Sequence, residues 1–469
     1  MTGRFFQRVT NPASQDTAQD KPLILTNEPA SDGAKGNGKP AAKPSSGPDF
    51  VSERVSLHRY LLDKINLGVL DTIEEKELHN ELRPLVRDYV KMNNFPLNAK
   101  ELDALISDIA DEILGLGPIE PLLDDETVSD ILVVGYNRVY VERFGRLQET
   151  QVRFKDEDHL MRIINKIVAS VGRRVDESSP LVDARLADGS RVNVAVRPVA
   201  VDGPQVSIRK FAKRPFDLDR LVKVGTLAQA MADLLAIAVE GKVSLVVSGG
   251  TGSGKTTLLN ALSSYIPHEE RLVTIEDAAE LQLQQPHVVR LETRPPTVDG
   301  RNEIMQRDLV KNALRMRPDR IIVGEVRGAE AFDMLQAMNT GHDGSMTTIH
   351  SNSPRDALGR MEQMVGMAGM PMTQNAIRVQ ISSAIDLIIQ LARMRDGSRK
   401  VVSIAEITGM EGDVIQTQEI MMYKRLGVED DGKVRGEFRA TGIRPRFLEV
   451  VSSMGLNIDR SVFDPTRTL

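Results

Sequence analysis

The chain has 469 residues, of which 41% are hydrophobic and 27% are charged, and these fractions exclude a wholly disordered or fibrous protein. A formal charge of −6 gives no general attraction to polyanions, and no dense basic patch is visible, so a nucleic-acid partner is not expected. The absence of cysteine excludes disulfides, thiol catalysis and cysteine-ligated metal sites. Since no apolar run is long enough to cross a bilayer and the N-terminus lacks the apolar core of a secretory signal, we expect a cytoplasmic protein.

Residues 1–50 are rich in proline, glycine, serine, alanine and lysine and contain few apolar residues. Such a segment cannot bury enough apolar surface to offset the conformational entropy that ordering removes. We therefore expect a disordered tail, which serves either as a plain linker or as a docking segment for a partner.

Residues 51–115 have a helical pattern of apolar residues. Two pairs, Thr72 with Glu75 and Asn98 with Glu101, have the spacing of a capping box and mark two helix starts. Pro84 is expected to break or kink the middle helix, because proline lacks a backbone N–H. The sequence predicts a small bundle of three amphipathic helices with a core of Leu57, Leu61, Ile65, Leu78, Leu82, Val86, Leu102, Leu105, Ile109 and Ile113.

Residues 116–212 are expected to form an α+β domain with an antiparallel sheet, because short strand-like runs are separated by turn signals. One helix, at about Glu157–Val171, interrupts these runs. Residues 213–225 lack a clear period and are expected to be a hinge. The predicted strands are Val128–Gly135, Arg138–Glu142, Arg191–Val196 and Gln205–Ile208.

Residues 226–469 alternate between helical patterns and apolar strand-like runs. Buried strands that alternate with helices are typical of a parallel sheet covered on both faces, so an α/β domain is expected. Its predicted strands are Ser244–Ser248, Arg271–Ile275, Ile321–Glu325, Ser345–His350 and Asp386–Ala392.

The segment from Gly249 to Thr256 matches the G-x-x-x-x-G-K-[ST] motif, with a buried strand before it and an apolar helix after it. Glycines allow a tight turn whose N–H groups point at phosphate oxygens, while Lys255 is positioned for the terminal phosphates and Thr256 for Mg²⁺. A structural turn needs no Lys-Thr pair at this spacing. We predict that Thr256 binds Mg²⁺ and that ATP binds to Gly249, Gly250, Thr251, Gly252, Ser253, Gly254, Lys255, Thr256 and Thr257.

Two acidic residues and two histidines accompany the strands of this domain. Glu276 follows the predicted strand after the phosphate-loop helix. Glu325 ends another, in which Gly324 occupies the place of the usual Walker B acid, so Glu325 would take over that duty. His342 and His350 bracket a strand and either place imidazoles near a phosphate or are ordinary surface or core residues. No third ligand for a zinc site is apparent beside them.

The motifs resemble those of a known family. The stretches GGTGSGKTT, TIEDAAEL, RPDRIIVGEVRG and TGHDGSMTTIHSNSP are similar to the Walker A, Asp box, Walker B and His box of the type II/IV secretion ATPases. Upstream, LGLGPIEPLLDDETVSDILVVG and DARLADGSRVNVAVRPV resemble the N-terminal domain of the CpaF/TadA branch, which serves tight-adherence (type IVc) pili. The resemblance implies a RecA-like P-loop motor domain preceded by a PAS-like α+β domain and the helical bundle. Type II secretion relatives often carry a four-cysteine zinc module, which this cysteine-free chain cannot form, so the tight-adherence branch is favoured.

The resemblance also implies a homohexameric ring with nucleotide at the subunit boundaries. Arg191 and Arg209 match the basic residues with which the N-terminal domain completes the site, and as arginine fingers they are expected to act in trans. Glu276 would orient the lytic water and Glu325 would bind Mg²⁺. The sequence is equally consistent with the opposite assignment of these two roles. Glu280 is a weaker candidate.

The function implied is an ATPase motor that powers pilus assembly, and retraction where it occurs, through an inner-membrane platform protein. Such a motor works at the cytoplasmic face of the inner membrane and associates with it peripherally, through its partners. One alternative is a DNA- or conjugation-linked ATPase of the same superfamily, whose members usually lack so long an N-terminal region. Another is a nucleotide-gated scaffold without useful turnover, against which the presence of Lys255, Thr256, Glu276 and Glu325 together argues.

Overall fold

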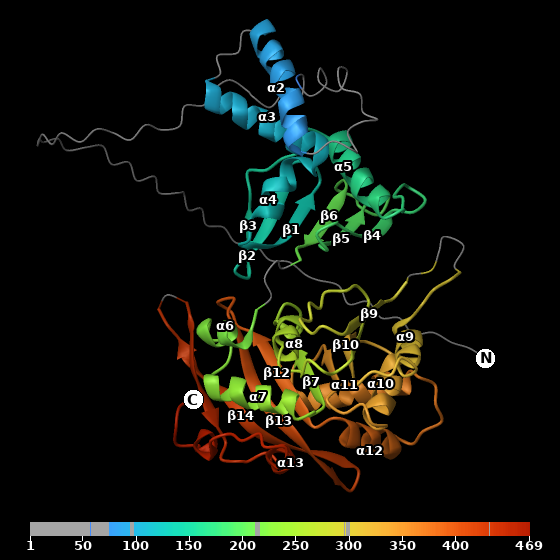
Figure 1. The fold of residues 1–469 in the computed structure, drawn as a ribbon, viewed down its shortest axis with the longest axis vertical. Coiled ribbons are helices and arrows are strands. Elements are labelled where there is room, and N and C mark those ends of the chain that lie inside the picture. The colour runs from blue at the N-terminus through green and yellow to red at the C-terminus, as the bar shows by residue number, and fades with distance from the viewer. Residues whose placement is uncertain are drawn as a thin grey trace, which may run out of the picture. The chain divides into compact units, whose positions relative to one another are not determined.

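The computed structural model of the chain describes residues 57, 75–93, 98–211, 216–294, 296, 301–430 and 432–469. The expected tail at 1–50, most of the first expected helix and the capping residue Thr72 lie outside the described residues. Residues from Val51 to Leu469 form one compact unit, in which the elements are labelled as in Figure 1.

The helical segment contains α2 (Glu75–Met92) and α3 (Ala99–Leu114), whose buried residues cluster together with Leu57. The predicted capping box of α3 is confirmed, because Asn98 and Glu101 each accept a hydrogen bond from the other's backbone N–H, at 3.0 and 2.8 Å. The predicted break at Pro84 does not occur, since α2 continues through it. Pro84 is exposed, so the hydrogen bond that it omits lies on the solvent side of the helix.

The next segment forms a six-stranded antiparallel sheet within the described residues, in the order β3-β2-β1-β6-β5-β4. Helix α5 packs its apolar stripe into the same core as the inward-facing residues of β1, β2, β5 and β6. The four predicted strands are confirmed, while β3 and β4 at the edges were not predicted. The elements are η2 (Gly117–Ile119), α4 (Glu120–Asp124), β1 (Val128–Val134), β2 (Arg138–Arg143), β3 (Arg146–Glu149), α5 (Glu157–Ser170), β4 (Leu181–Arg185), β5 (Arg191–Ala195) and β6 (Gln205–Arg209).

The expected hinge contains a helix. Helix α6 (Leu218–Lys223) begins at Asp217, whose carboxylate accepts a hydrogen bond from the backbone N–H of Arg220 at 2.7 Å. Its Leu218 and Leu221 are buried in the core of the domain that follows. This part of the expected hinge therefore packs with the second domain.

The second domain is built on a sheet of nine strands among the described residues, in the order β15-β14-β13-β12-β7-β11-β10-β8-β9. From β12 to β9 all neighbouring strands are parallel. The elements are α7 (Gln229–Glu240), β7 (Leu245–Gly249), α8 (Lys255–Ser263), β8 (Leu272–Glu276), β9 (Val288–Glu292), α9 (Gln306–Ala313), β10 (Arg320–Val326), α10 (Glu330–Met338), β11 (Met346–Ile349), α11 (Pro354–Gly366), α12 (Gln374–Ala384), β12 (Leu387–Arg393), β13 (Arg399–Glu411), β14 (Val414–Val428), β15 (Val434–Ala440), α13 (Phe447–Ser453) and η3 (Arg460–Phe463).

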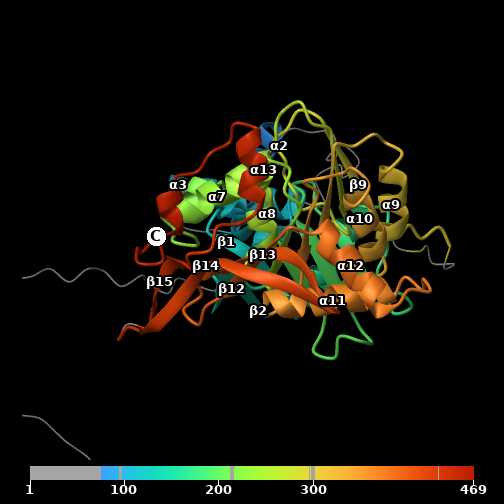
Figure 2. The same cartoon turned by 90° about the horizontal axis from the view of Figure 1, so that it is seen from below.

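Helices cover both faces of this sheet, and alternate residues of its strands enter two separate cores. Leu245 and Val247 of β7 lie in a core with α7, α8 and α13, whereas Val246 lies in a core with α9 to α12. Figure 2 shows α7, α8 and α13 on the side of the sheet opposite α11 and α12. The buried parallel strands with helices on both faces confirm the predicted RecA-like α/β fold.

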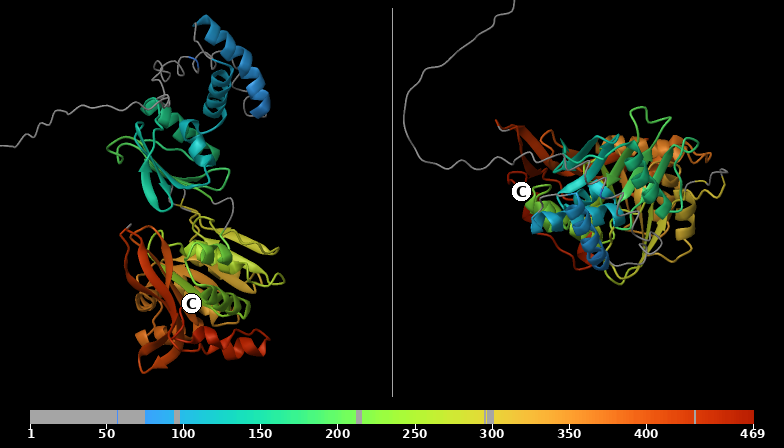
Figure 3. Two further views of the ribbon diagram at one scale, coloured as in Figure 1. Left: turned by 90° about the vertical axis from the view of Figure 1, so that its left-hand side faces the viewer. Right: turned by 90° about the horizontal axis from the view of Figure 1, so that it is seen from above.

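The sheet is nevertheless not purely parallel. After β12 the chain continues through the antiparallel strands β13, β14 and β15, which extend the sheet at one edge (Figure 3). The prediction of a parallel sheet is therefore wrong for this edge. Strand β14 has only two fully buried residues, Met421 and Ile420, so its sequence lacks the apolar run by which the other strands were predicted.

Among the described residues, no helix has both the length and the apolar character needed to cross a membrane.

Candidate functional site

The phosphate loop joins β7, which ends at Gly249, to α8, which begins at Lys255. Gly252 and Gly254 have φ values of 67° and 98°, in the region that favours glycine. A Cβ atom on Gly249 would lie 2.5 Å from Ser253 Oγ and 2.8 Å from the carbonyl oxygen of Leu391. Ser253 Oγ also donates a hydrogen bond to the Gly250 carbonyl at 2.8 Å. The loop is thus closed tightly on itself, with the helix N-terminus pointing into it.

Four neighbouring parallel strands bring the predicted residues to one edge of the sheet. Strands β7, β11, β10 and β8 lie side by side, and their carboxyl ends carry the phosphate loop, His350, Glu325 and Glu276 respectively. All of these line a cavity of about 900 Å³, together with residues of the N-terminal sheet. This volume is within the range of sites that enclose small-molecule ligands.

Glu276 is the most deeply buried acid of the cavity, with 4% of its surface exposed. Its Oε1 accepts hydrogen bonds from the backbone N–H groups of Glu280 and Leu281 at 2.9 and 3.0 Å, whereas its buried Oε2 has no partner. Burial raises the pKa of Glu276 to about 7, although the two hydrogen bonds act against this shift. The carboxyl group is therefore poised to exchange a proton near neutral pH.

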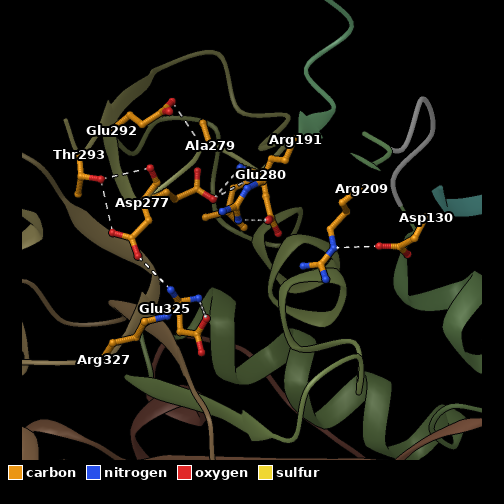
Figure 4. A network of polar contacts seen from close by, with 12 residues as sticks. Asp130, Arg191, Arg209, Asp277, Ala279, Glu280, Glu292, Thr293, Glu325 and Arg327 are labelled. Carbon is orange, nitrogen blue, oxygen red and sulfur yellow. Dashed lines mark hydrogen bonds and ion pairs between the residues drawn. The ribbon is translucent and has the colours of Figure 1, made fainter. Parts of the chain in front are cut away.

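Glu325 belongs to a network of charged groups at the end of β10 (Figure 4). Its Oε2 lies 2.7 Å from Arg327, whose guanidinium also pairs with Asp277 at 3.3 Å. Asp277 in turn accepts hydrogen bonds from Thr293 Oγ1 at 3.5 Å and from Gln306 Nε2 at 3.0 Å. Arg327 therefore links the acidic ends of β10 and β8 through two ion pairs.

Lys255 lies across the loop, and its Nζ donates to the Gly250 carbonyl at 3.3 Å. Burial lowers the pKa of Lys255; Glu325 opposes this shift, and nearby arginines, Arg327 first, add to it. Burial also lowers the pKa of His350, and the charge of Lys255 lowers it further. His350 and Lys255 thus share the electrostatic environment of the phosphate loop.

His342 does not reach this site. It precedes β11, whereas His350 follows it, so the two histidines lie at opposite ends of the strand. Its Nδ1 lies 3.1 Å from the carbonyl oxygen of Ala337, and the residue does not line the cavity. The structure therefore does not support the expectation that both imidazoles lie near a phosphate.

The two arginines of the N-terminal sheet reach the cavity from β5 and β6, where Arg191 and Arg209 are paired in register. Arg191 forms an ion pair of 2.7 Å with Glu280, and Arg209 lies 3.4 Å from Asp130 of its own sheet (Figure 4). Both arginines line the cavity of their own chain, and the expectation that they act in trans stays a prediction.

Four arginines at the cavity were not predicted as site residues. The sequence could have identified Arg327 as a site residue, because it stands two residues after Glu325 in the Walker B stretch. Arg360 lies on α11, while Arg393 and Arg399 lie where β12 ends and β13 begins, so folding alone brings them to the phosphate loop.

The residues present fit a nucleoside triphosphate with Mg²⁺. A Cβ atom on Gly249 would collide with Ser253 of the loop, so the loop needs glycine there to keep its shape, and several guanidinium groups line the cavity and would offset the charge of phosphates. Thr256 is half-buried in the cavity wall, and its hydroxyl would be the protein ligand of the Mg²⁺ from this loop. No group of three or more histidine, aspartate or glutamate side chains in the described part of the chain could hold a metal by itself. Mg²⁺ needs only one or two protein ligands beside substrate phosphates.

Known proteins resemble this chain over most of its length. The family described as "Type II/IV secretion system protein" matches residues 112–443. A Mycobacterium tuberculosis protein named for conjugal transfer is 39% identical over 309 residues, which are 65% of this chain and 87% of that protein. The type IV secretion system protein PtlH of Bordetella pertussis is 32% identical over 315 residues, covering 62% of this chain and 93% of PtlH. The X-ray structure of the Legionella pneumophila ATPase DotB has a TM-score of 0.44 at 22% identity, covering 74% of this chain and 84% of that one.

Because the family match spans most of the chain and includes the phosphate loop, this chain belongs to the type II/IV secretion system protein family and is a P-loop ATPase.

Proposed function

We propose that this chain is the hexameric motor of a tight-adherence (type IVc) pilus. It would use ATP and Mg²⁺ to drive assembly, and retraction where the pilus retracts, through an inner-membrane platform protein at the cytoplasmic face of the inner membrane. One observation carries the proposal: a single cavity contains the phosphate loop, two strand-end glutamates and two arginines from another sheet of the same chain. Movement of that sheet would therefore complete or dismantle the nucleotide site, which couples hydrolysis to mechanical work.

Within this proposal each side chain has a role. Lys255 binds the terminal phosphates, and Thr256 and Glu325 hold Mg²⁺. Glu276 orients and deprotonates the attacking water, and its raised pKa and unpaired Oε2 support this choice over Glu325. Arg191 and Arg209 stabilise the charge that develops on the transferred phosphoryl group. His350 lines the same cavity and would report the state of the phosphates, whereas His342 lies outside the cavity and takes no part.

A second candidate is an ATPase for conjugal transfer, because curated relatives carry conjugal-transfer names. The two candidates share the nucleotide site and differ in the machine that they drive. Deleting the gene in the organism that carries it should abolish surface pili and leave plasmid transfer frequency unchanged. Loss of transfer with pili intact would favour the second candidate.

The nucleotide site is tested with Lys255→Ala. Removing the ammonium group should reduce steady-state phosphate release from ATP to background, because the terminal phosphates lose their main cationic contact. Thermal unfolding should stay close to that of the unmodified chain. The control is Lys223→Ala, which removes an exposed lysine of α6 outside the cavity. Hydrolysis that persists in Lys255→Ala would contradict the assignment of the phosphate loop.

A further inference from the structure

Two tight turns from different sheets meet beside the phosphate loop. One is the β2–β3 turn, which contains Phe144 and Gly145, and the other is the β12–β13 turn around Gly397. A Cβ atom on Gly145 would lie 3.2 Å from the Gly397 carbonyl oxygen, and one on Gly397 would lie 3.3 Å from the Phe144 carbonyl oxygen. Both glycines have positive φ values, 76° and 87°. The two backbones are thus in direct contact, which larger residues would prevent.

A carboxylate of the N-terminal sheet lies between two guanidinium groups next to this contact. Glu142, at the end of β2, has its oxygens 3.9 Å from Arg393 and 3.8 Å from Arg399. Its side chain is only 18% exposed. Arg393 also donates a hydrogen bond to the Gly145 carbonyl, so it ties the turn of one sheet to the end of a strand of the other.

Arg399 continues this connection into the phosphate loop. Its Nε donates to the carbonyl oxygen of Gly252 at 2.9 Å, and a Cβ atom on Gly254 would lie 3.4 Å from its Cδ. The side chain is therefore held on one side by the loop that cradles phosphate and on the other by Glu142. Glu142, Arg393 and Arg399 all line the cavity.

We propose that Arg399 is a positioning residue for the phosphate loop and that Glu142 sets its orientation, so that docking of the N-terminal sheet raises nucleotide affinity. The inference rests on the nucleotide site described above and adds to it a residue pair with no place in the motifs. A charged donor on the Gly252 carbonyl fixes the loop in its binding conformation before the nucleotide arrives. Without Glu142 the guanidinium is free to turn away, and the loop loses part of this preorganisation.

The test is a double-mutant cycle on the dissociation constant of a fluorescent ADP analogue, with Glu142→Gln, Arg399→Gln and the double variant of the full chain. Each single variant should weaken binding about fivefold, and the double variant should bind no more weakly than Arg399→Gln alone, because the carboxylate acts through the arginine. In steady state, KM for ATP should rise while kcat changes less. Effects of the single variants that multiply, or unchanged binding in Arg399→Gln, would overturn the proposal.

Two controls separate this outcome from others. Arg395→Gln removes an exposed arginine of the same turn that does not line the cavity, and its nucleotide affinity should stay unchanged. Lys255→Ala tests the nucleotide site itself: if it binds normally, the phosphate-loop assignment fails. If Lys255→Ala loses binding while Arg399→Gln keeps it, only the positioning role fails.

Discussion

At the scale of single residues, the structure explains why glycine stands where the Walker B motif usually has an acid. A Cβ atom on Gly324 would lie 2.8 Å from Cγ of Glu276 on the neighbouring strand β8. The side chain of Glu276 thus occupies the space that a residue-324 side chain would need. Glycine at position 324 therefore allows Glu276 to approach β10 closely, while Glu325 remains the acid proposed for the Walker B duty.

The raised pKa of Glu276 predicts how stability depends on pH. Because the pKa of Glu276 is about 7 in the folded state and 4.5 for an ordinary glutamate, protonated Glu276 contributes stability that is fully present below pH 4.5 and lost as pH rises through 7. The loss amounts to about 3 kcal/mol. Glu276→Gln keeps a neutral side chain at every pH, so its advantage in urea unfolding over the unmodified chain should grow with pH across this window.

The control for this measurement is Glu303→Gln, which changes an exposed glutamate. Its difference from the unmodified chain should stay constant with pH. If the advantage of Glu276→Gln is equally constant, the carboxyl group is ionised in the folded state well below neutral pH, and its choice as the base loses its main support.

Two histidines that are close in the sequence lie at opposite ends of strand β11. His342 and His350 stand close together in the chain, and this spacing suggested a shared site. A strand runs from the amino end to the carboxyl end of a parallel sheet, so the residues that precede and follow it are separated by the length of the strand. Only the residue after the strand can join the phosphate loop at the carboxyl edge, which strand direction would have predicted had it been applied to this pair.

At the scale of elements, β10 begins with a charged residue that is fully buried. Arg320 has no exposed surface, and its Nε lies 2.6 Å from Oε2 of Glu270, while its second amino group lies 2.9 Å from Oε1. Its remaining nitrogen donates to the Val239 carbonyl. This arginine therefore joins the start of β10 to the end of α7 and to the loop before β8.

We expect Arg320→Ala to lower the free energy of unfolding by about 3–5 kcal/mol, because it leaves the carboxylate of Glu270 buried without its main partner. Urea unfolding followed by circular dichroism measures the change. Arg315→Ala, which removes an exposed arginine near the same strand, should have little effect. Equal stability of the two variants would show that Glu270 finds compensation in water or in Lys242, which lies 3.9 Å from it.

Strands were predictable from sequence where buried residues form an apolar run, as in β7, or alternate with exposed ones, as in β5, and not where few residues are buried. All five residues of β7 and of β8 are buried, and their apolar runs identified them. All four residues of β3 are exposed, and only two residues of β14 are fully buried, so neither has the apolar run or the regular alternation of a predicted strand. Pro84 was expected to break or kink α2; the break does not occur, and Pro84 lies at an exposed position of a continuous helix.

At the scale of the whole chain, contacts between the two sheet domains occur within one polypeptide. Arg191 pairs with Glu280, and Arg185 pairs with Glu292 at 3.0 Å. The phosphate loop motif made its own site predictable, but no sequence pattern shows which chain's arginine completes it, because that depends on how domains pack. Within one chain both arginines reach their own cavity, while the action in trans expected from the family resemblance stays a prediction.

Mixing variants decides between the two arrangements. Arg191→Ala should reduce turnover by about 10³-fold if Arg191 is an arginine finger, and Lys255→Ala should abolish it. If the site is completed in cis, no site in a mixed assembly has both groups, so mixing the two variants should give no more phosphate release than their separate activities added together. If the site is completed in trans, an intact phosphate loop beside an intact arginine of the neighbouring subunit would restore turnover.

A control shows whether subunits exchange between assemblies: unmodified chains are mixed with a labelled Lys255→Ala chain, and the particles are then sized. Recovery of activity in such exchanging mixtures would mean that the contact between Arg191 and Glu280 is replaced by one across the subunit boundary when the protein assembles.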